Sequence, residues 1–572
     1  MTLELAPTPT ATLIEGGVGC GKTAALVARA SELLEGGAAP EDILVLAATP
    51  DAARALDARL AEAVGERAGA IEVACARDVA LGLLASEEGR AFSGRAGRLV
   101  TPVELGFILE DMKVGGLKQR RLREMLKFFY RNETELAGGA DDDDGWLIPG
   151  EEGDTHALLR AVLHFTGGIL EPEASAMAVR FLLASPEALA GAQRPHVLVD
   201  DYQMYSRASQ HLANLIARDS ITVAADPTAV AEVFESYPYG EGVGEFTQAN
   251  EGCERIVLAT SRACPAAARA ASRLRTALDA GAAALGDGAA PVALAAPSAP
   301  DRAAAASFTA LEAADPAAEM DAVADAVQAA LEAGADPSSV YVLAFHPAWE
   351  RRVARAQGLE GDELIGALAD ALDLPAEERE RTMQLVGVLT APAPDSEGAA
   401  APAFPDGAIA APGDAPALIA RARRRMNAPV FENAEGRVRV GDGAHLTGLT
   451  PATLVLCGFV NGFFPPRDYF DATVTTPDRQ KLVRTADTRR LYAAVGKPTE
   501  RLAASWFTAT GLVEAETLKL DITRVRLRRG EGIATTASSI YLAEIDPAAE
   551  PSAPEFPGDP QASGDAAAVT SS

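Results

Sequence analysis

The segment Gly16–Thr23, with the sequence GGVGCGKT, has the residue types and the spacing of a phosphate-binding loop. It fits the pattern G-x-x-x-x-G-K-[ST], in which glycines let successive backbone N–H groups surround a phosphate. Lys22 would supply a point charge for the β- and γ-phosphates, and Thr23 a hydroxyl ligand for Mg²⁺. The alternative is a glycine-rich turn that only caps a helix. We predict that the loop binds ATP with Mg²⁺ through Gly16, Gly17, Val18, Gly19, Cys20, Gly21, Lys22 and Thr23.

Two adjacent carboxylates follow an apolar run farther along the chain, in HVLVDD at residues 196–201. Downstream of a phosphate-binding loop, such a pair suits metal and water chemistry. Asp200 would hold Mg²⁺, and Asp201 would orient or deprotonate the attacking water. The alternative is a pair of aspartates that caps a helix N-terminus.

Apolar runs that alternate with helical patterns must position these residues. The first set of runs lies at residues 11–15, 43–49, 196–201, 220–226 and 255–260. Strands that alternate with helices are typical of a parallel α/β sheet. The long stretch between the second and third runs has helical spacing, which predicts a helical insertion in this sheet domain. A second α/β pattern follows, with strands expected at 339–345, 437–440, 453–459 and 502–508.

Composition excludes several classes of protein. The chain has 572 residues and a net charge of −30, and its five cysteines include no CxxC pair. Neither a disulfide framework nor a zinc or iron–sulfur cluster is therefore suggested. No apolar stretch reaches the roughly 18–20 residues of a membrane span. We expect a soluble, cytoplasmic protein without a membrane partner. The net charge taken alone disfavours nucleic acid, since DNA binding requires cationic side chains that pair with phosphates.

One segment has the opposite charge. Lys113–Arg131 contains seven basic residues and one acidic residue, a net charge of +6, and three aromatic residues follow one another within it. Basic side chains beside aromatic rings suit single-stranded DNA, which offers phosphates to pair and bases to stack. The alternative is an amphipathic helix with its aromatic rings in the core and its arginines in solvent. The candidate DNA-binding residues here are Lys118, Arg120, Arg121, Lys127, Phe129 and Tyr130.

The motifs taken together resemble those of the UvrD/Rep-like superfamily 1 DNA helicases, in the family's order, over roughly residues 11–510. Residues 43–60 resemble motif Ia, which implies that Thr49 contacts DNA. VDDYQMYS, at 199–206, is similar to motif II and implies a nucleotide-site role for Gln203. VAADPTAVAEVF resembles motif III and keeps Asp226. LATSRACP resembles motif IV, whose phosphate-contacting arginine would be Arg262. RRLYAAVGKPTERL resembles motif VI.

The sequence also departs from the family pattern. No glutamine precedes the phosphate-binding loop, so the residue that reads adenine in the family is missing. Asp201 stands where the family has glutamate, Ala229 where motif III has glutamine, and Thr447 where motif V has lysine. The arginine of motif VI is Lys497, which offers a point charge in place of a bidentate clamp. We list Asp201, Arg262 and Lys497 as the candidate catalytic residues.

The resemblance implies an α/β fold of two RecA-like P-loop NTPase domains, with a helical insertion in the first and a reduced insertion in the second. In the family's terms the expected segments are domain 1A at 1–95 and 191–278, insertion 1B at 96–190, a linker at 279–305, domain 2A at 306–345 and 431–544, a reduced 2B-like insertion with a mobile loop at 346–430, and a disordered acidic tail at 545–572.

The implied function is an ATP-dependent helicase or translocase that moves on single-stranded DNA, in DNA repair or recombination. The rival is a weakened helicase-like subunit that uses ATP as a switch and binds DNA or a helicase–nuclease partner. A small-molecule kinase is a third alternative, which the helicase order of the motifs disfavours. ATP binding is better supported than fast hydrolysis or unwinding.

Overall fold

A computed structural model describes residues 3–113, 117–139, 144–230, 237–285, 304, 306–349, 438–443, 446–471, 473–528 and 531–548. Most of the expected linker, most of the expected 2B-like insertion and nearly all of the expected tail lie outside these residues. The expected linker begins inside a helix, since α12 (Pro265–Leu285) continues beyond residue 279.

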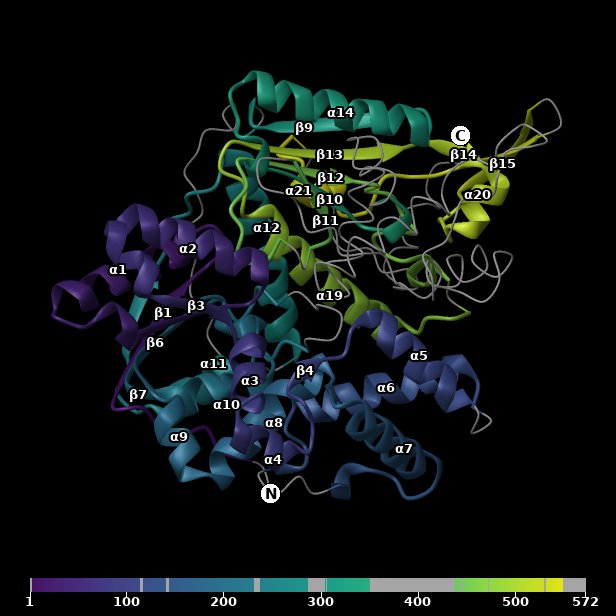
Figure 1. Ribbon diagram of the computed structural model, residues 1–572. Coiled ribbons are helices and arrows are strands. Elements are labelled where there is room, and N and C mark those ends of the chain that lie inside the picture. Colours follow the sequence, from purple (N-terminus) through teal and green to yellow (C-terminus); the bar gives the residue numbers. More distant parts are fainter. Residues whose placement is uncertain are drawn as a thin grey trace, which may run out of the picture.

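The first domain is built on a six-stranded parallel sheet with the order β3-β2-β6-β7-β1-β8 (Figure 1). The strands at its centre are short apolar runs whose alternate residues face opposite sides, so helices must cover both faces. Thus Ile43 and Val45 pack on one face, and Leu44 and Leu46 on the other. The strands are β1 (Thr10–Gly16), β2 (Ile43–Ala47), β3 (Glu72–Cys75), β6 (Arg194–Val199), β7 (Ala217–Ala225) and β8 (Glu254–Leu258).

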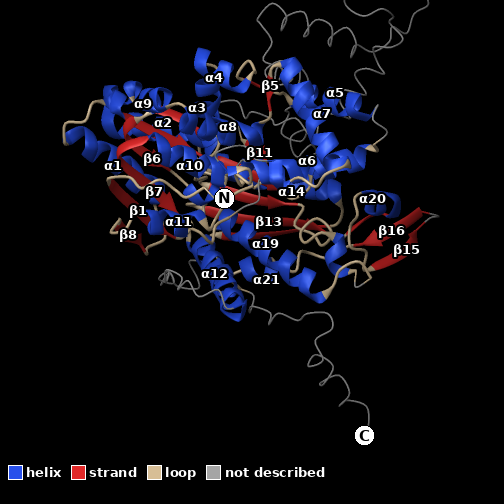
Figure 2. Ribbon diagram, turned by 90° about the horizontal axis from the view of Figure 1, so that it is seen from below, coloured by secondary structure: helices blue, strands red, loops and turns tan. Residues whose placement is uncertain are grey.

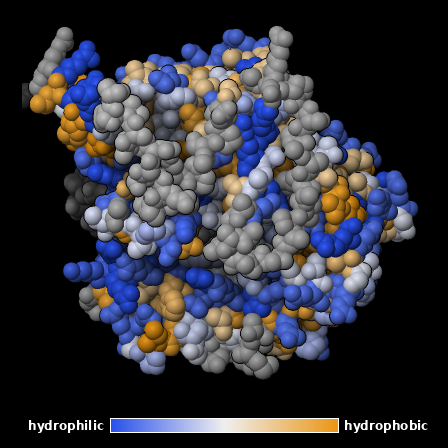
Figure 3. All heavy atoms as spheres, turned by 180° about the vertical axis from the view of Figure 1, so that it is seen from behind, coloured by the Kyte–Doolittle hydropathy of each residue, from blue (hydrophilic) through white to orange (hydrophobic). Residues whose placement is uncertain are grey.

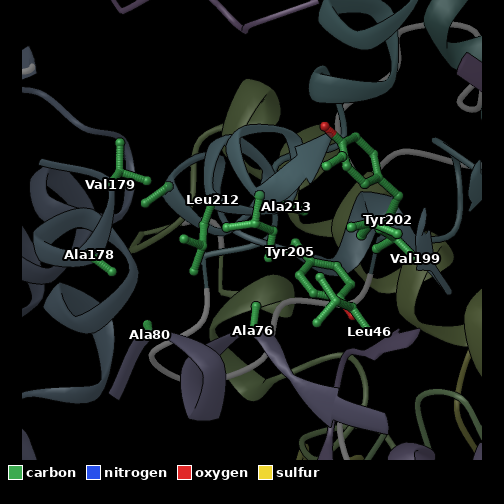
Figure 4. Packing of buried hydrophobic residues seen from close by; sticks show 14 of the residues in the cluster. Leu46, Ala76, Ala80, Ala178, Val179, Val199, Tyr202, Tyr205, Leu212 and Ala213 are labelled. Atoms are coloured by element: carbon green, nitrogen blue, oxygen red, sulfur yellow. The ribbon is translucent and has the colours of Figure 1, made fainter. Parts of the chain in front are cut away.

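Two groups of helices cover this sheet. One face carries α1 (Lys22–Glu35) and α2 (Pro50–Val64), and the other carries α3 (Ala76–Leu84), α8 (Glu171–Ala184) and α10 (Arg207–Ile216). Figure 4 shows residues of the second group, namely Ala76 and Ala80, Ala178 and Val179, and Leu212 and Ala213, which belong to one hydrophobic cluster with Leu46 and Val199 of the strands. Within the described residues, this domain also contains α4 (Glu87–Ser93), α9 (Pro186–Ala192) and α11 (Gly242–Ala249).

The helical insertion has a core of its own. It contains α5 (Pro102–Met112), α6 (Gln119–Thr134) and α7 (Glu151–Thr166), with the short strands β4 (Arg98–Leu99) and β5 (Gly168–Ile169) beside them (Figure 1). This core ends near Leu170, and α8 packs in the core of the first sheet. The expected insertion at 96–190 is therefore divided by packing into a separate helical part and a part of the sheet domain.

The second domain is a five-stranded parallel sheet with the order β11-β10-β12-β13-β9. Helix α14 (Pro316–Glu332) lies along one face of it, and α12, α19 (Pro477–Val495) and α21 (Leu542–Ile545) pack together (Figures 1 and 2). The strands are β9 (Phe308–Ala313), β10 (Val340–Ala344), β11 (Arg439–Gly441), β12 (Thr453–Cys457) and β13 (Arg501–Phe507). The α/β fold with two parallel sheets is confirmed, whereas β3 and β9 were not foreseen.

A small antiparallel sheet, also not foreseen, extends from the second domain (Figure 2). It consists of β14 (Ala509–Gly511), β15 (Arg524–Arg528) and β16 (Glu531–Thr535), beside the short helix α20 (Leu512–Thr517). On the face opposite to that of Figure 1, hydrophobic residues form scattered patches among hydrophilic ones (Figure 3).

Candidate nucleotide site between the two sheets

The phosphate-binding loop joins the end of β1 to the start of α1, as its sequence predicts. Gly19 and Gly21 have φ angles of +76° and +87°, which side chains other than that of glycine rarely adopt. The Lys22 ammonium donates a hydrogen bond to the Gly17 carbonyl at 3.1 Å, so the lysine folds back over its own loop. Burial raises the pKa of the Cys20 thiol, which therefore stays protonated.

The two carboxylates lie directly after β6, beside the loop. The Thr23 hydroxyl donates to Asp200 Oδ2 at 2.8 Å. Asp200 is buried, and burial together with the charge of Asp201 raises its pKa to about 7. Asp201 has a φ angle of +50°, a left-handed conformation that is uncommon outside glycine and that costs about 1 kcal/mol or more. The chain therefore holds the Asp201 side chain in place at the expense of backbone strain.

Thr23 and Asp200 offer what Mg²⁺ requires. Both present oxygen atoms, and Asp200 Oδ1 is buried without a hydrogen-bond partner among the described residues. Within those residues, no group of three or more His, Cys, Asp or Glu side chains is arranged to hold a metal ion. Mg²⁺ would thus be bound by one hydroxyl, one carboxylate and the oxygens of a phosphate ligand, as is usual for this ion.

Arg262 contacts the loop, and Lys497 lines the same cavity from the second domain. The backbone N–H of Arg262 donates to the Gly19 carbonyl at 2.7 Å, and a Cβ on Gly21 would lie 2.8 Å from Nε of the Arg262 side chain. Lys497 follows α19 and donates from Nζ to the Leu446 carbonyl at 2.7 Å. Burial lowers the pKa of Lys497, and the nearby Asp201 carboxylate opposes that effect. The sequence-predicted residues from both halves of the chain therefore lie around one site.

A cavity of about 250 Å³ separates the two domains at this point. Its wall combines side chains from the phosphate-binding loop with the segment that replaces motif V. The first domain contributes Lys22, Thr23, Arg59, Asp201, Gln203 and Arg262, among others, and the second contributes Thr447, Gly448, Leu449, Thr450, Lys497 and Thr499.

Sequence reasoning missed Arg59 of α2. Arg59 lies two helical turns beyond Ala52 and so shares its face of the helix. Ala52 contacts the second domain, because a Cβ on Gly448 would lie only 2.2 Å from the Ala52 Cβ. Arg59 lines the cavity, and no local sequence pattern indicates this, because the cavity forms only where the two domains meet.

Gln203 connects the candidate base to motif III. Its side chain is fully buried, donates to Asp201 Oδ1 at 3.2 Å and accepts the backbone N–H of Asp226 at 3.0 Å. Ala229 lines the cavity but has no polar side chain with which to contact a phosphate. Gln203 therefore orients Asp201 in this structure.

The prediction that Phe129 and Tyr130 stack on DNA bases is wrong. Their rings are 3% and 5% exposed in the core of the insertion. The Phe129 ring lies 4.9 Å from His156 and 6.3 Å from Trp146, measured between ring centroids. The apolar positions of α6 recur at helical spacing and face inward, so the amphipathic-helix alternative holds for the aromatic rings.

The basic residues of α6 do lie on its solvent face, and several pair with acids. Lys118, Arg120, Arg121 and Lys127 are exposed. Arg120 contacts Glu124, and Arg121 contacts Glu151 and Glu152. These acids reduce the local positive charge without covering the side chains.

Thr49 caps a helix in this structure, and the DNA contact expected of it stays a prediction. Its hydroxyl accepts the N–H of Ala52 at 3.1 Å and so caps the N-terminus of α2. The side chain is partly exposed.

Comparison with known families bears on this arrangement. Residues 4–114, which contain the phosphate-binding loop and the motif Ia segment, match the family model of the UvrD/REP helicase N-terminal domain. This match supports a UvrD/Rep-like helicase. A helicase-type function and DNA binding follow at the level of the family, whose members use ATP with Mg²⁺. A search of curated proteins returns no match.

Within the described part of the chain, no helix has both the length and the apolar character needed to cross a bilayer. The cytoplasmic location stays a prediction from the sequence.

Proposed function

We propose that this protein is a DNA-dependent ATPase of the UvrD/Rep-like kind, which couples ATP hydrolysis to movement on single-stranded DNA in repair or recombination. The observation that carries the proposal is the cavity between the domains. Its wall contains Lys22 and Thr23 of the phosphate-binding loop, the Asp201 carboxylate, and two further cations, Arg262 and Lys497. Cations and a carboxylate around one small space suit phosphoryl transfer to water.

Each residue has a task that its contacts support. Lys22 would leave the Gly17 carbonyl and pair with the β- and γ-phosphates. Thr23 and Asp200 would hold Mg²⁺, which neutralises phosphate charge when bound. Asp201, held by Gln203 and by its own backbone, would accept a proton from the attacking water. Arg262 and Lys497 would stabilise charge on the γ-phosphate.

Slow turnover is part of the proposal. Lys497 already donates to the Leu446 carbonyl and supplies one point charge where the family has a bidentate arginine. Loss of such an arginine costs on the order of a thousandfold in rate. We expect hydrolysis well below that of a fully equipped helicase.

Movement would follow from the contact between the domains. The backbone of the second domain touches the loop, since a Cβ on Gly19 would lie 2.3 Å from the Gly496 carbonyl oxygen. ATP binding and product release at this contact would alternately close and open the cavity. Single-stranded DNA would bind through its phosphates to the exposed basic side chains of α6.

ATP turnover with and without single-stranded DNA tests the proposal, with Lys22→Ala as the inactive variant and Arg29→Ala, on the same helix, as the matched control. We expect slow hydrolysis that DNA stimulates, that Lys22→Ala abolishes and that Arg29→Ala retains. Tight ATP binding with background turnover on every DNA tested would contradict translocation and would support the rival in which ATP acts as a switch.

A further inference from the structure

Tyr492 joins the second domain to the phosphate-binding loop through one hydroxyl group. It lies in α19, is fully buried, and donates to Asp226 Oδ2 at 2.8 Å. The Tyr492 hydroxyl oxygen also accepts the backbone N–H of Val18 at 3.2 Å. Three elements far apart in the sequence, namely the loop after β1, the end of β7 and α19, therefore meet at this atom.

The Asp226 carboxylate is fixed from its other side. Arg275 of α12 donates to Asp226 Oδ1 at 3.2 Å, and the Thr228 N–H donates to the same atom at 3.0 Å. Burial and the Asp226 charge raise the pKa of Tyr492 well above its usual value, so the phenol keeps the proton that it donates. The hydroxyl therefore contacts a rigid, charged acceptor.

Because its surroundings are closely packed, removal of the Tyr492 hydroxyl should destabilise this region. Val18 belongs to the hydrophobic cluster that contains Leu491 and Val495 of α19. A Cβ on Gly496 would lie 2.9 Å from Val18 Cγ1, so little space is left for water to replace the phenol oxygen. A buried N–H or carboxylate oxygen without a partner is destabilised by loss of solvation.

The same contacts set the geometry of the cavity. Val18 lies in the phosphate-binding loop directly before Gly19, and α19 leads through Gly496 into Lys497. The backbone of Asp226 holds Gln203, which in turn holds Asp201. A shift of the Tyr492 hydroxyl would therefore change how Lys22, Lys497 and Asp201 lie relative to one another.

We propose that Tyr492 is a positioning residue of the nucleotide site, whose hydroxyl fixes the phosphate-binding loop against Asp226 and so keeps the groups of both domains aligned on one phosphate. The catalytic part of this inference rests on the proposed ATPase function. The effect of Tyr492 on the position of the phosphate-binding loop does not depend on that function.

The test compares Tyr492→Phe, which removes only the hydroxyl, with Tyr202→Phe. Tyr202 is equally buried, and its hydroxyl accepts a hydrogen bond from Asn214 at 3.0 Å inside the first domain. Amide hydrogen exchange of the segment that contains Val18 should become about tenfold faster in Tyr492→Phe, because its N–H loses a buried partner. The Tyr202→Phe protein should match the wild type in this segment.

Kinetics provide the second measurement. In Tyr492→Phe we expect kcat to fall about tenfold or more while KM for ATP changes less than about threefold, because misalignment affects the transition state more than binding. In an Asp226→Asn background, Tyr492→Phe should reduce kcat much less than it does in the wild type, since both changes disrupt the same hydrogen bond.

Unchanged exchange at Val18 in Tyr492→Phe would overturn the inference, as would additive losses in the double variant. If Lys22→Ala does not reduce turnover, the proposed function fails, and hydrogen exchange still decides whether Tyr492 fixes the loop.

Discussion

Replacing Phe129 by alanine separates a core residue from a DNA-stacking residue. The ring is 3% exposed and makes edge contacts with Trp146 and His156. Truncation of a buried phenylalanine costs about 3 to 5 kcal/mol, and the loss of two aromatic neighbours favours the upper part of that range. Urea denaturation followed by tryptophan fluorescence measures this loss, because Trp146 lies in the affected cluster. The transition of the insertion should move to lower urea by at least about 1 M.

Phe165→Ala is the matched control, since this ring is 90% exposed on the neighbouring helix α7. It should change the free energy of unfolding by no more than about 0.5 kcal/mol. A Phe129→Ala protein that unfolds at the wild-type urea concentration, and that binds single-stranded DNA much more weakly, would refute the assignment of this ring to the core.

Three further predictions concern charge. Arg120→Glu combined with Lys127→Glu should weaken binding of single-stranded DNA and reduce the slope of log K against log salt by about 1.4, or 0.7 for each lost phosphate contact; an unchanged slope would place the DNA path elsewhere. Burial lowers the pKa of His211 to about 4, below the roughly 6.5 of an unfolded histidine. As the pH falls from 6.5 to 4, the free energy of unfolding should therefore decrease by up to about 3 kcal/mol more in the wild type than in His211→Gln. Equal pH profiles of the two proteins would contradict this. Glu319 accepts hydrogen bonds from an indole, a backbone N–H and a hydroxyl. Glu319→Gln should therefore destabilise the second domain by about 3 kcal/mol in thermal or chemical unfolding. Glu332→Gln, at an exposed position on the same helix, should not.

The parts of this protein that sequence predicted well are those set by local pattern. A short apolar run, a glycine-rich loop and a helix define the region around Lys22 through backbone geometry that does not depend on distant residues. The strands β2 and β12 are almost continuous apolar runs, and β6 and β7 end in apolar runs, of the kind that a parallel sheet buries on both faces.

The sequence-based predictions are wrong or incomplete where tertiary packing determines the position of a side chain or a strand. In α6, the spacing of Leu122, Met125 and Phe129 already places the ring on the apolar face, but the adjacent arginines suggested a stacking role. Arg59 lines the cavity between the two domains, and Tyr492 of the second domain bonds to Asp226 of the first. No local sequence pattern specifies either position. Strand β9 has an Ala-rich, half-exposed sequence and gains its place by pairing with β13.

The central claim is that the cavity between the domains binds a nucleoside triphosphate with Mg²⁺. Titration calorimetry of ATP with Mg²⁺ tests it most directly, in the wild type, in Lys22→Ala and in Arg29→Ala. We expect one site per chain whose affinity falls about 10- to 150-fold in Lys22→Ala, the equivalent of one lost charge-assisted hydrogen bond, and is retained in Arg29→Ala. Equal affinity in the wild type and Lys22→Ala, or no binding to the wild type, would contradict the account.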